Sequence, residues 1–213
     1  YSFSFANYYN PKMMNFGMLR VLNDDTVVPA MGFGTHPHDN MEIITLVLEG
    51  ELEHKDSMGT GSVIYKDEVQ VMSAGSGITH SEFNPSDKDG VKLFQIWIFP
   101  KEKNIKPRYD QKSFPISERK NKLIPAVSGL NKEGSLYIHQ DAEIYLGNFE
   151  KGKKVNYQIS NPANGAYILV VDGSLKVGDE ELFNRDAIGI SEVENCEIEM
   201  IEDSNFLIID VPM

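Results

Sequence analysis

The sequence predicts an all-β protein made of two tandem β-barrels of the jelly-roll type. Short segments rich in Val, Ile, Leu and Thr alternate with glycine turns along most of the 213 residues. No stretch repeats its apolar residues every 3.6 positions, and the best helix candidate is a single turn near 117–120. A strand, an acidic residue followed by glycine, and another strand occur in both halves, which indicates two related units.

The first barrel is expected within residues 1–100. Glycine pairs at 59/61 and 75/77 mark tight turns, and the segment LFQIWIF at 93–99 is typical of a central buried strand. Strands are predicted at 42–48, 51–55, 62–65, 68–72 and 93–99. Short strands joined by such turns favour an antiparallel barrel.

A change of composition separates the two halves. Residues 101–115 carry five Lys or Arg residues, are accompanied by prolines at 100, 107 and 115, and show no strand pattern. We therefore expect a linker and packing segment over 101–134 and a second barrel over 135–213. Val170–Leu175 repeats the strand–turn–strand pattern of Val47–Leu52. Strands of the second barrel are predicted at 135–139, 143–149, 154–159, 166–171, 174–177 and 206–211.

The composition argues against two classes of binding partner, nucleic acids and membranes. The net charge of −12 opposes direct binding to nucleic acid, whose phosphates would be repelled. No run of 18 apolar residues occurs, so no membrane partner is expected. Cys196, the single cysteine, fits a reducing compartment, and we expect a cytoplasmic protein. The chain begins at Tyr1 in a segment that lacks signal-peptide features, so we expect the natural N-terminus to lie upstream.

Two short motifs carry most of the chemistry. His36 and His38 are two residues apart, and His80 and Glu82 repeat that spacing about forty residues later. In a β-strand, side chains two apart point to the same face, so each pair can direct two ligand atoms at one point. Three imidazoles and one carboxylate suit a mononuclear divalent metal that keeps open coordination positions. A single histidine is more often an ordinary buried or surface residue, but three of the five histidines fall in these two motifs.

The motifs resemble those of a known superfamily. Gly32-x3-His36-x-His38-x3-Glu42, followed by a glycine turn, resembles the first cupin motif. Gly75-x-Gly77-x2-His80-x3-Asn84 resembles the second, with glycine at position 75 where cupins usually have proline. More specifically, the chain resembles the pirin family, including the bacterial pirin-like quercetin 2,3-dioxygenases. The matching segments are 4–9 (SFANYY), 32–38 (GFGTHPH), 41–43 (MEI), 48–50 (LEG), 54–57 (HKDS), 72–82 (MSAGSGITHSE) and 95–97 (QIW).

This resemblance implies two cupin barrels and one metal site. The N-terminal barrel would hold the metal through His36, His38, His80 and Glu82, and the C-terminal barrel would be a degenerate, metal-free unit. Fe(II) is the expected metal, with Cu, Mn, Ni or Zn as alternatives. Glu42, the carboxylate of the general cupin motif, is an alternative ligand to Glu82. We favour a buried polar or outer role for Glu42, and a polar or hydrogen-bonding role for His54.

The implied activity is that of a metal-dependent dioxygenase. A flavonol or similar enol or phenol would bind at the open metal position together with dioxygen, and Glu82 would also act as the general base. Apolar residues near the motifs could line the substrate pocket or belong to the barrel core: Met13, Met14, Phe16, Phe33, Met41, Met72 and Phe83.

Two other functions fit the same ligand set. One is a redox-responsive binding module, as in pirins that act as transcriptional co-regulators, in which a protein partner replaces the substrate. The other is a cupin isomerase or epimerase acting on sugars, against which the pirin-specific segments argue.

Overall fold

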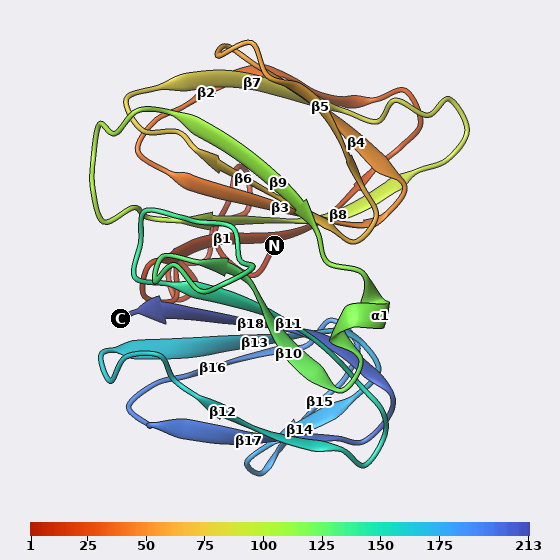
Figure 1. Cartoon of the computed structure of the whole chain (residues 1–213), viewed down its shortest axis with the longest axis vertical. Coiled ribbons are helices and arrows are strands. Elements are labelled where there is room, and N and C mark those ends of the chain that lie inside the picture. The colour runs from red at the N-terminus through yellow and green to blue at the C-terminus, as the bar shows by residue number, and fades with distance from the viewer. The chain divides into compact units, whose positions relative to one another are not determined.

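Two units of β-structure make up the chain, and the structure, a computed structural model, describes residues 1–213 (Figure 1). Unit 1 comprises residues 1–15, 19–114 and 138–140. Unit 2 comprises residues 16–18, 115–137 and 141–213. The only helix is α1 (Ile116–Arg119), and no helix is long and apolar enough to cross a membrane.

Unit 1 consists of two antiparallel sheets that face each other (Figure 1). The five-stranded sheet has the order β1 (Leu19–Val27), β8 (Val91–Ile98), β3 (Glu42–Glu49), β6 (Glu68–Ser73) and β9 (Arg108–Ser113). The four-stranded sheet has the order β2 (Gly32–His38), β7 (Ile78–Phe83), β4 (Glu51–Asp56) and β5 (Gly61–Tyr65). Apolar side chains from both sheets fill one end of the space between them: Val27, Val47, Leu52, Ile64, Val91 and Leu93.

Unit 2 repeats this arrangement. Its five-stranded sheet has the order β10 (Lys122–Ser128), β11 (Glu143–Phe149), β18 (Ser204–Pro212), β13 (Asn164–Asp172) and β16 (Ala187–Ile190). Its four-stranded sheet has the order β12 (Lys154–Gln158), β17 (Asn195–Met200), β14 (Leu175–Val177) and β15 (Glu180–Leu182). Four strands of each large sheet and all four strands of each small sheet therefore correspond in order. The predicted all-β class with two tandem barrels is confirmed.

The repeated turn explains one piece of local geometry that the two units share. Gly50 after β3 has φ +75°, and Gly173 after β13 has φ +89°, a backbone region in which side chains are strained. A Cβ atom at Gly173 would also lie 2.2 Å from the Asp203 carbonyl oxygen. Each acidic-Gly pair therefore ends a strand and starts the next one, as the sequence pattern indicates.

Two predictions about strands after residue 100 are wrong. The basic segment 101–115 predicts no strand, but β9 pairs antiparallel with β6 at the edge of the large sheet. Most β9 residues are at least partly exposed, so the strand needs no apolar alternation. Residues 135–139, predicted as a strand, form only an isolated bridge between Val127 and Leu136. The boundaries 1–100, 101–134 and 135–213 stay a prediction.

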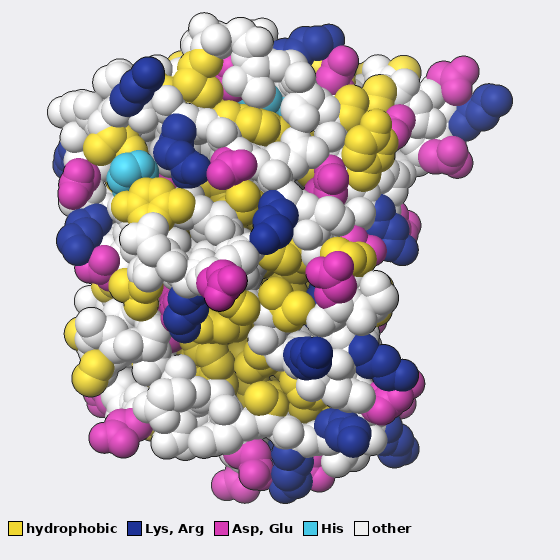
Figure 2. Space-filling view, viewed as in Figure 1, with side chains coloured by type: hydrophobic (Ala, Val, Ile, Leu, Met, Phe, Trp, Pro, Cys, Tyr) yellow, Lys and Arg dark blue, Asp and Glu magenta, His cyan; other side chains and the backbone are white.

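Charged side chains of both signs are interspersed on the face that Figure 2 shows, with no continuous basic surface in that view. The protein as a whole has an excess of acidic over basic residues, 32 against 20. A nucleic-acid backbone would meet no concentrated positive potential on this face.

Candidate metal centre

Paired strands of the small sheet of unit 1 bring the two sequence motifs together. β2 and β7 are antiparallel neighbours, and His36 lies directly opposite His80. The register shifts between Phe33 and His36. Phe33 lies opposite Glu82 and His36 opposite His80, so three steps along β2 correspond to two along β7. This β-bulge lets Phe33 and His36 line the same cavity despite their odd spacing.

Three imidazoles form a compact cluster in this sheet. One ring nitrogen from each of His36, His38 and His80 lies within 4.8 Å of the other two. Their ring centroids are 4.4 Å apart for His36 and His80, 4.8 Å for His36 and His38, and 4.9 Å for His38 and His80. This spacing of neutral nitrogen donors suits a divalent transition metal.

The hydrogen bonds and the burial of these rings fit metal ligation. The Nδ1 of His36 lies 2.8 Å from the Gly34 carbonyl oxygen, which only accepts, so Nδ1 donates and Nε2 keeps its lone pair. The Nε2 of His80 is buried and has no hydrogen-bond partner. Burial lowers the pKa of His38 to about 4 and that of His80 to about 3, so both rings are neutral at pH 7. Metal ligation requires neutral imidazoles with free lone pairs.

Glu82 lies beside this cluster and is held by two other side chains. Gln95 donates to Glu82 Oε2 at 2.8 Å, and Thr45 donates to Oε1 at 3.4 Å. A Glu82 oxygen lies within 4.8 Å of nitrogens of His54 and His80, in a second group of ligand-type atoms that shares His80 with the first. The side chain is almost fully buried, and burial raises its pKa to about 7. A carboxyl with this pKa can exchange a proton near neutral pH.

His54 and Glu42 have different environments. His54 is fully buried, its Nε2 lies 3.2 Å from Asp56 Oδ2, and its Nδ1 lies 3.4 Å from His80 Nδ1. It is therefore a hydrogen-bond partner of the cluster and not an outward-facing polar residue. Glu42 belongs to neither group of ligand-type atoms, and Ser73 donates to its Oε2 at 2.7 Å. Burial raises the pKa of Glu42 to about 7.

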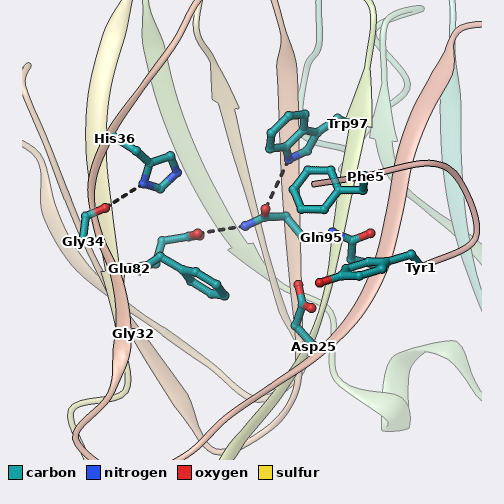
Figure 3. Close-up of a pocket in the computed structure, with 11 residues that line it drawn as sticks. Tyr1, Phe5, Asp25, Gly32, Gly34, His36, Glu82, Gln95 and Trp97 are labelled. Atoms are coloured by element: carbon teal, nitrogen blue, oxygen red, sulfur yellow. Dashed lines mark hydrogen bonds between the residues drawn. The ribbon is translucent and has the colours of Figure 1, made fainter. Parts of the chain in front are cut away.

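A cavity of about 470 Å³ opens beside His36 and Glu82 (Figure 3). Phe5 and Trp97 lie on the side opposite His36, and their rings meet edge to face with centroids 5.3 Å apart. Gln95 connects the two sides, because it accepts from Trp97 Nε1 at 3.2 Å and donates to Glu82. Asn23 and Asp25 of β1 supply further polar groups to the wall. The cavity thus combines an aromatic wall with polar groups near the imidazoles.

Sequence reasoning found few of these wall residues. Of the seven apolar candidates, Phe33 lines the cavity, whereas Met72 is fully buried in the core. Phe5, Asn23, Asp25, Gln95 and Trp97 were missed as lining residues. The only available signal was the alternation of residues in QIW, which places Gln95 and Trp97 on one face of β8.

Comparisons with known proteins agree with this architecture. A profile of the family described as Pirin matches residues 1–98, and a profile described as Quercetinase C-terminal cupin domain matches residues 126–211. The chain is 42% identical over 212 residues to a protein named quercetin 2,3-dioxygenase from Escherichia coli K12, covering 100% of this chain and 90% of the relative. The chain belongs to the pirin family. This pirin is also 38% identical over 209 residues to a pirin-like protein from Caulobacter vibrioides, covering 98% of the chain and 89% of that protein.

Two solved structures share the fold. The bacterial pirin YhhW from Escherichia coli, solved in complex with nickel(II), is 41% identical and superimposes with a TM-score of 0.94, covering 99% of this chain and 90% of YhhW. YhaK from Escherichia coli is 26% identical, with a TM-score of 0.84 and coverage of 100% and 93%. The histidine cluster of this pirin and the metal in a close relative support a divalent metal in unit 1.

Proposed function

We propose that this pirin is a metal-dependent dioxygenase with quercetin 2,3-dioxygenase-type activity on a flavonol or a similar enol or phenol. The observation that carries the proposal is the cluster of three imidazoles beside a cavity with an aromatic wall. The relative from Escherichia coli that bears the name quercetin 2,3-dioxygenase supports the choice of reaction. A cavity of about 470 Å³ is within the range of small-molecule sites.

The proposed ligands are His36, His38, His80 and Glu82. His36 and His80 each offer an Nε2 lone pair, and Glu82 follows His80 on the same face of β7. Three neutral imidazoles and one carboxylate would leave a divalent ion with a net charge near +1, which favours an anionic enolate or phenolate. A divalent metal held by these residues would lower the pKa of a coordinated hydroxyl and would offer open positions to substrate and dioxygen. Fe(II) is our proposed metal, with Cu, Mn, Ni and Zn compatible with the same donors.

Glu82 is the proposed general base. Burial raises its pKa to about 7 before a metal binds, and beside the metal its carboxylate would be placed to accept a proton from a substrate hydroxyl. Gln95 holds the carboxyl through one amide N–H, while the Trp97 indole N–H orients that amide by donating to its oxygen. Deprotonation would make the substrate electron-rich; dioxygen, as the oxidant, would add both of its oxygen atoms as the ring opens, and Glu82 would return the proton to the product.

The cavity wall supports a flat aromatic substrate. Phe5, Phe33 and Trp97 offer apolar ring surface, and the polar groups of Asn23 and Asp25 can accept hydrogen bonds from substrate hydroxyls. The proposed partners are therefore a small flavonol-like molecule and dioxygen. We place the protein in the cytoplasm, with no direct contact to nucleic acid.

The test is anaerobic loading of the metal-free protein with Fe(II), Cu(II), Mn(II) or Ni(II), followed by quercetin and air. We expect oxygen uptake together with loss of the flavonol absorbance, and loss of both in Glu82→Gln. Glu42→Gln is the matched control, because Glu42 is equally buried but lies in neither ligand group. Turnover that survives in Glu82→Gln and disappears in Glu42→Gln would make Glu42 the functional carboxylate.

The alternative functions give different outcomes in the same assay. If no metal supports turnover, but the affinity for a protein partner changes with the oxidation state of the metal, the protein is a redox-responsive binding module. Activity on a sugar that does not depend on oxygen would indicate an isomerase. Either result would overturn the proposed dioxygenase.

A further inference from the structure

A buried chain of three side chains leads away from the imidazole cluster. His80 Nδ1 lies 3.4 Å from His54 Nδ1, and His54 Nε2 lies 3.2 Å from Asp56 Oδ2. The side chains of His54 and Asp56 are both inaccessible to solvent. The register of β4 and β7 produces this chain, because Asp56 lies opposite His80 and His54 opposite Glu82.

The carboxylate at the end of the chain is itself fixed. Asp56 Oδ1 accepts from the backbone N–H of Met58 at 2.9 Å and from that of Thr60 at 3.0 Å. These two bonds occupy one oxygen in the turn between β4 and β5 and leave Oδ2 directed at His54. On its other side, the His54 ring packs against Tyr109 of β9, with centroids 4.7 Å apart. His54 is therefore held by packing as well as by hydrogen bonds.

The chemistry of the atoms fixes where each proton lies. A carboxylate oxygen only accepts, so His54 Nε2 carries its proton and donates to Asp56. His54 Nδ1 then has a lone pair and accepts from His80 Nδ1–H. His80 Nε2 is left deprotonated, and this is the buried nitrogen that has no protein partner. If His54 carried its proton on Nδ1 instead, the lone pair of its Nε2 would face a lone pair of Asp56 Oδ2.

We propose that Asp56 and His54 form a positioning pair that fixes the tautomer and the orientation of the His80 imidazole. The inference rests on the proposed metal centre, for which it identifies how one ligand is prepared. Ligating histidines commonly donate their second ring N–H to an outer acceptor, and loss of that acceptor typically weakens metal binding by about 10- to 100-fold. Here the acceptor is a second imidazole, which is set in turn by a carboxylate.

The first experiment reads the tautomers directly in the metal-free wild-type protein. Long-range ¹⁵N–¹H correlation spectra of the imidazoles should show His80 with its proton on Nδ1 and His54 with its proton on Nε2. A His80 ring protonated on Nε2 would overturn the proposal. This measurement needs no variant and no substrate, so its result is independent of the proposed dioxygenase activity.

The second experiment uses Asp56→Asn to reverse the direction of the hydrogen bonds from Asp56 through His54 to His80. The oxygen of the substituted side chain keeps the two backbone bonds, and its NH₂ group then faces His54 Nε2 and donates to it. His54 must place its proton on Nδ1, which moves the His80 proton to Nε2 and blocks the ligand lone pair. We expect the affinity for Ni(II) alone, measured by calorimetry, to fall about 10- to 100-fold. Unchanged Ni(II) affinity would refute the pair while leaving the proposed function intact.

Asp210→Asn is the matched control for loss of a buried aspartate. Asp210 in unit 2 is also fully buried and accepts hydrogen bonds from Tyr157, Ser160 and Asn164. This variant should lose thermal stability and keep its Ni(II) affinity. An equal loss of affinity in both variants would attribute the effect to general destabilisation and overturn the inference.

Variants of His54 separate a positioning role from direct ligation. His54→Gln can donate to Asp56 and accept from His80, so it should retain most of the Ni(II) affinity that His54→Leu loses. If His54→Gln binds Ni(II) as weakly as His54→Leu, His54 acts as a ligand, consistent with its place in the second group of ligand-type atoms, and the positioning role is wrong.

Discussion

The two units share a strand order, but different kinds of side chain line the space between their sheets. In unit 1, His36 faces His80 across β2 and β7, whereas in unit 2 the corresponding strands β12 and β17 place Tyr157 opposite Cys196. His54 lies opposite Glu82 in unit 1, and Val177 lies opposite Ile198 in unit 2. The same backbone therefore presents nitrogen and oxygen donors in one unit and mostly apolar side chains in the other.

This difference extends to the packing of the two units. In unit 2, one cluster of buried apolar residues from both sheets includes Ile198, Val177 and Phe206. A buried polar pair in this unit is satisfied, since the Tyr157 hydroxyl donates to Asp210 at 2.7 Å. Unit 1 instead leaves His80 Nε2 without a protein partner and divides its apolar residues into separate clusters. Unsatisfied buried groups at functional sites reduce stability in exchange for chemistry.

Removal of a cluster histidine should have the largest effect. His36→Ala or His80→Ala should reduce Ni(II) affinity by more than about 100-fold, since losing a ligand costs more than losing its outer partner. Calorimetric titration with Ni(II) measures the change. His139→Ala is the control, because His139 lies in neither group of ligand-type atoms and should bind one Ni(II) as the wild type does. If all three variants bind Ni(II) with equal affinity, the imidazole cluster does not distinguish unit 1 from unit 2 as a metal site.

A cavity in the core of unit 2 should affect stability alone. Phe206 is buried and stacks on Phe149 with centroids 5.7 Å apart. Phe206→Ala should lower the free energy of unfolding by about 3–5 kcal/mol, and Phe206→Leu should lower it by less. Thermal and urea unfolding measure the loss. Ni(II) affinity below the unfolding transition should stay at the wild-type value, and a parallel decrease would show that unit 2 shapes the metal centre.

The pH dependence of stability should reveal the buried carboxyl at position 42. By alignment of the turns at Gly50 and Gly173, Glu42 corresponds to Gly165 of unit 2. Burial raises the pKa of Glu42 from 4.5 to about 7, so its stabilising contribution is complete below pH 4.5 and is lost as pH rises through 7. Relative to Glu42→Gln, the metal-free wild type should lose up to about 3 kcal/mol between pH 4.5 and 8.

Melting temperatures of both proteins across this pH range give the comparison. The contribution of Glu82 is common to both proteins and cancels. A constant difference between the two melting curves would show that Glu42 titrates at its ordinary value in the folded protein.

The smallest effect on stability should come from making unit 1 more like unit 2. In the metal-free protein, His80→Leu removes a buried nitrogen without a partner but also removes the donor to His54 Nδ1, so the two effects should offset each other to within about 1 kcal/mol while Ni(II) binding is lost. The melting temperatures of the metal-free proteins, measured side by side, test this. A large loss of stability would show that the His80–His54 contact is needed for folding.

Much of the fold was predictable because the apolar strands and acidic-Gly turns follow simple local rules. The strands that line the cavity were harder to find. β1 (LRVLNDDTV) lacks regular alternation, since Asn23 and Asp25 occupy inward positions that a structural strand would fill with apolar residues. The motifs correctly indicated that His36, His38 and His80 meet. They could not indicate that Gln95 holds Glu82, because that contact joins strands of different sheets.

The β-bulge in β2 makes the site sensitive to chain length and not only to residue identity. Because of the additional residue, Phe33 and His36 both line the cavity although three positions separate them. Straightening β2 at its present length, or adding a residue to it, would turn either the aromatic ring or the imidazole to the other face, whereas deleting Thr35 together with the bulge would leave a spacing of two and keep both on one face. Within this family, we therefore expect a change of one residue in this spacing to be accompanied by gain or loss of the bulge.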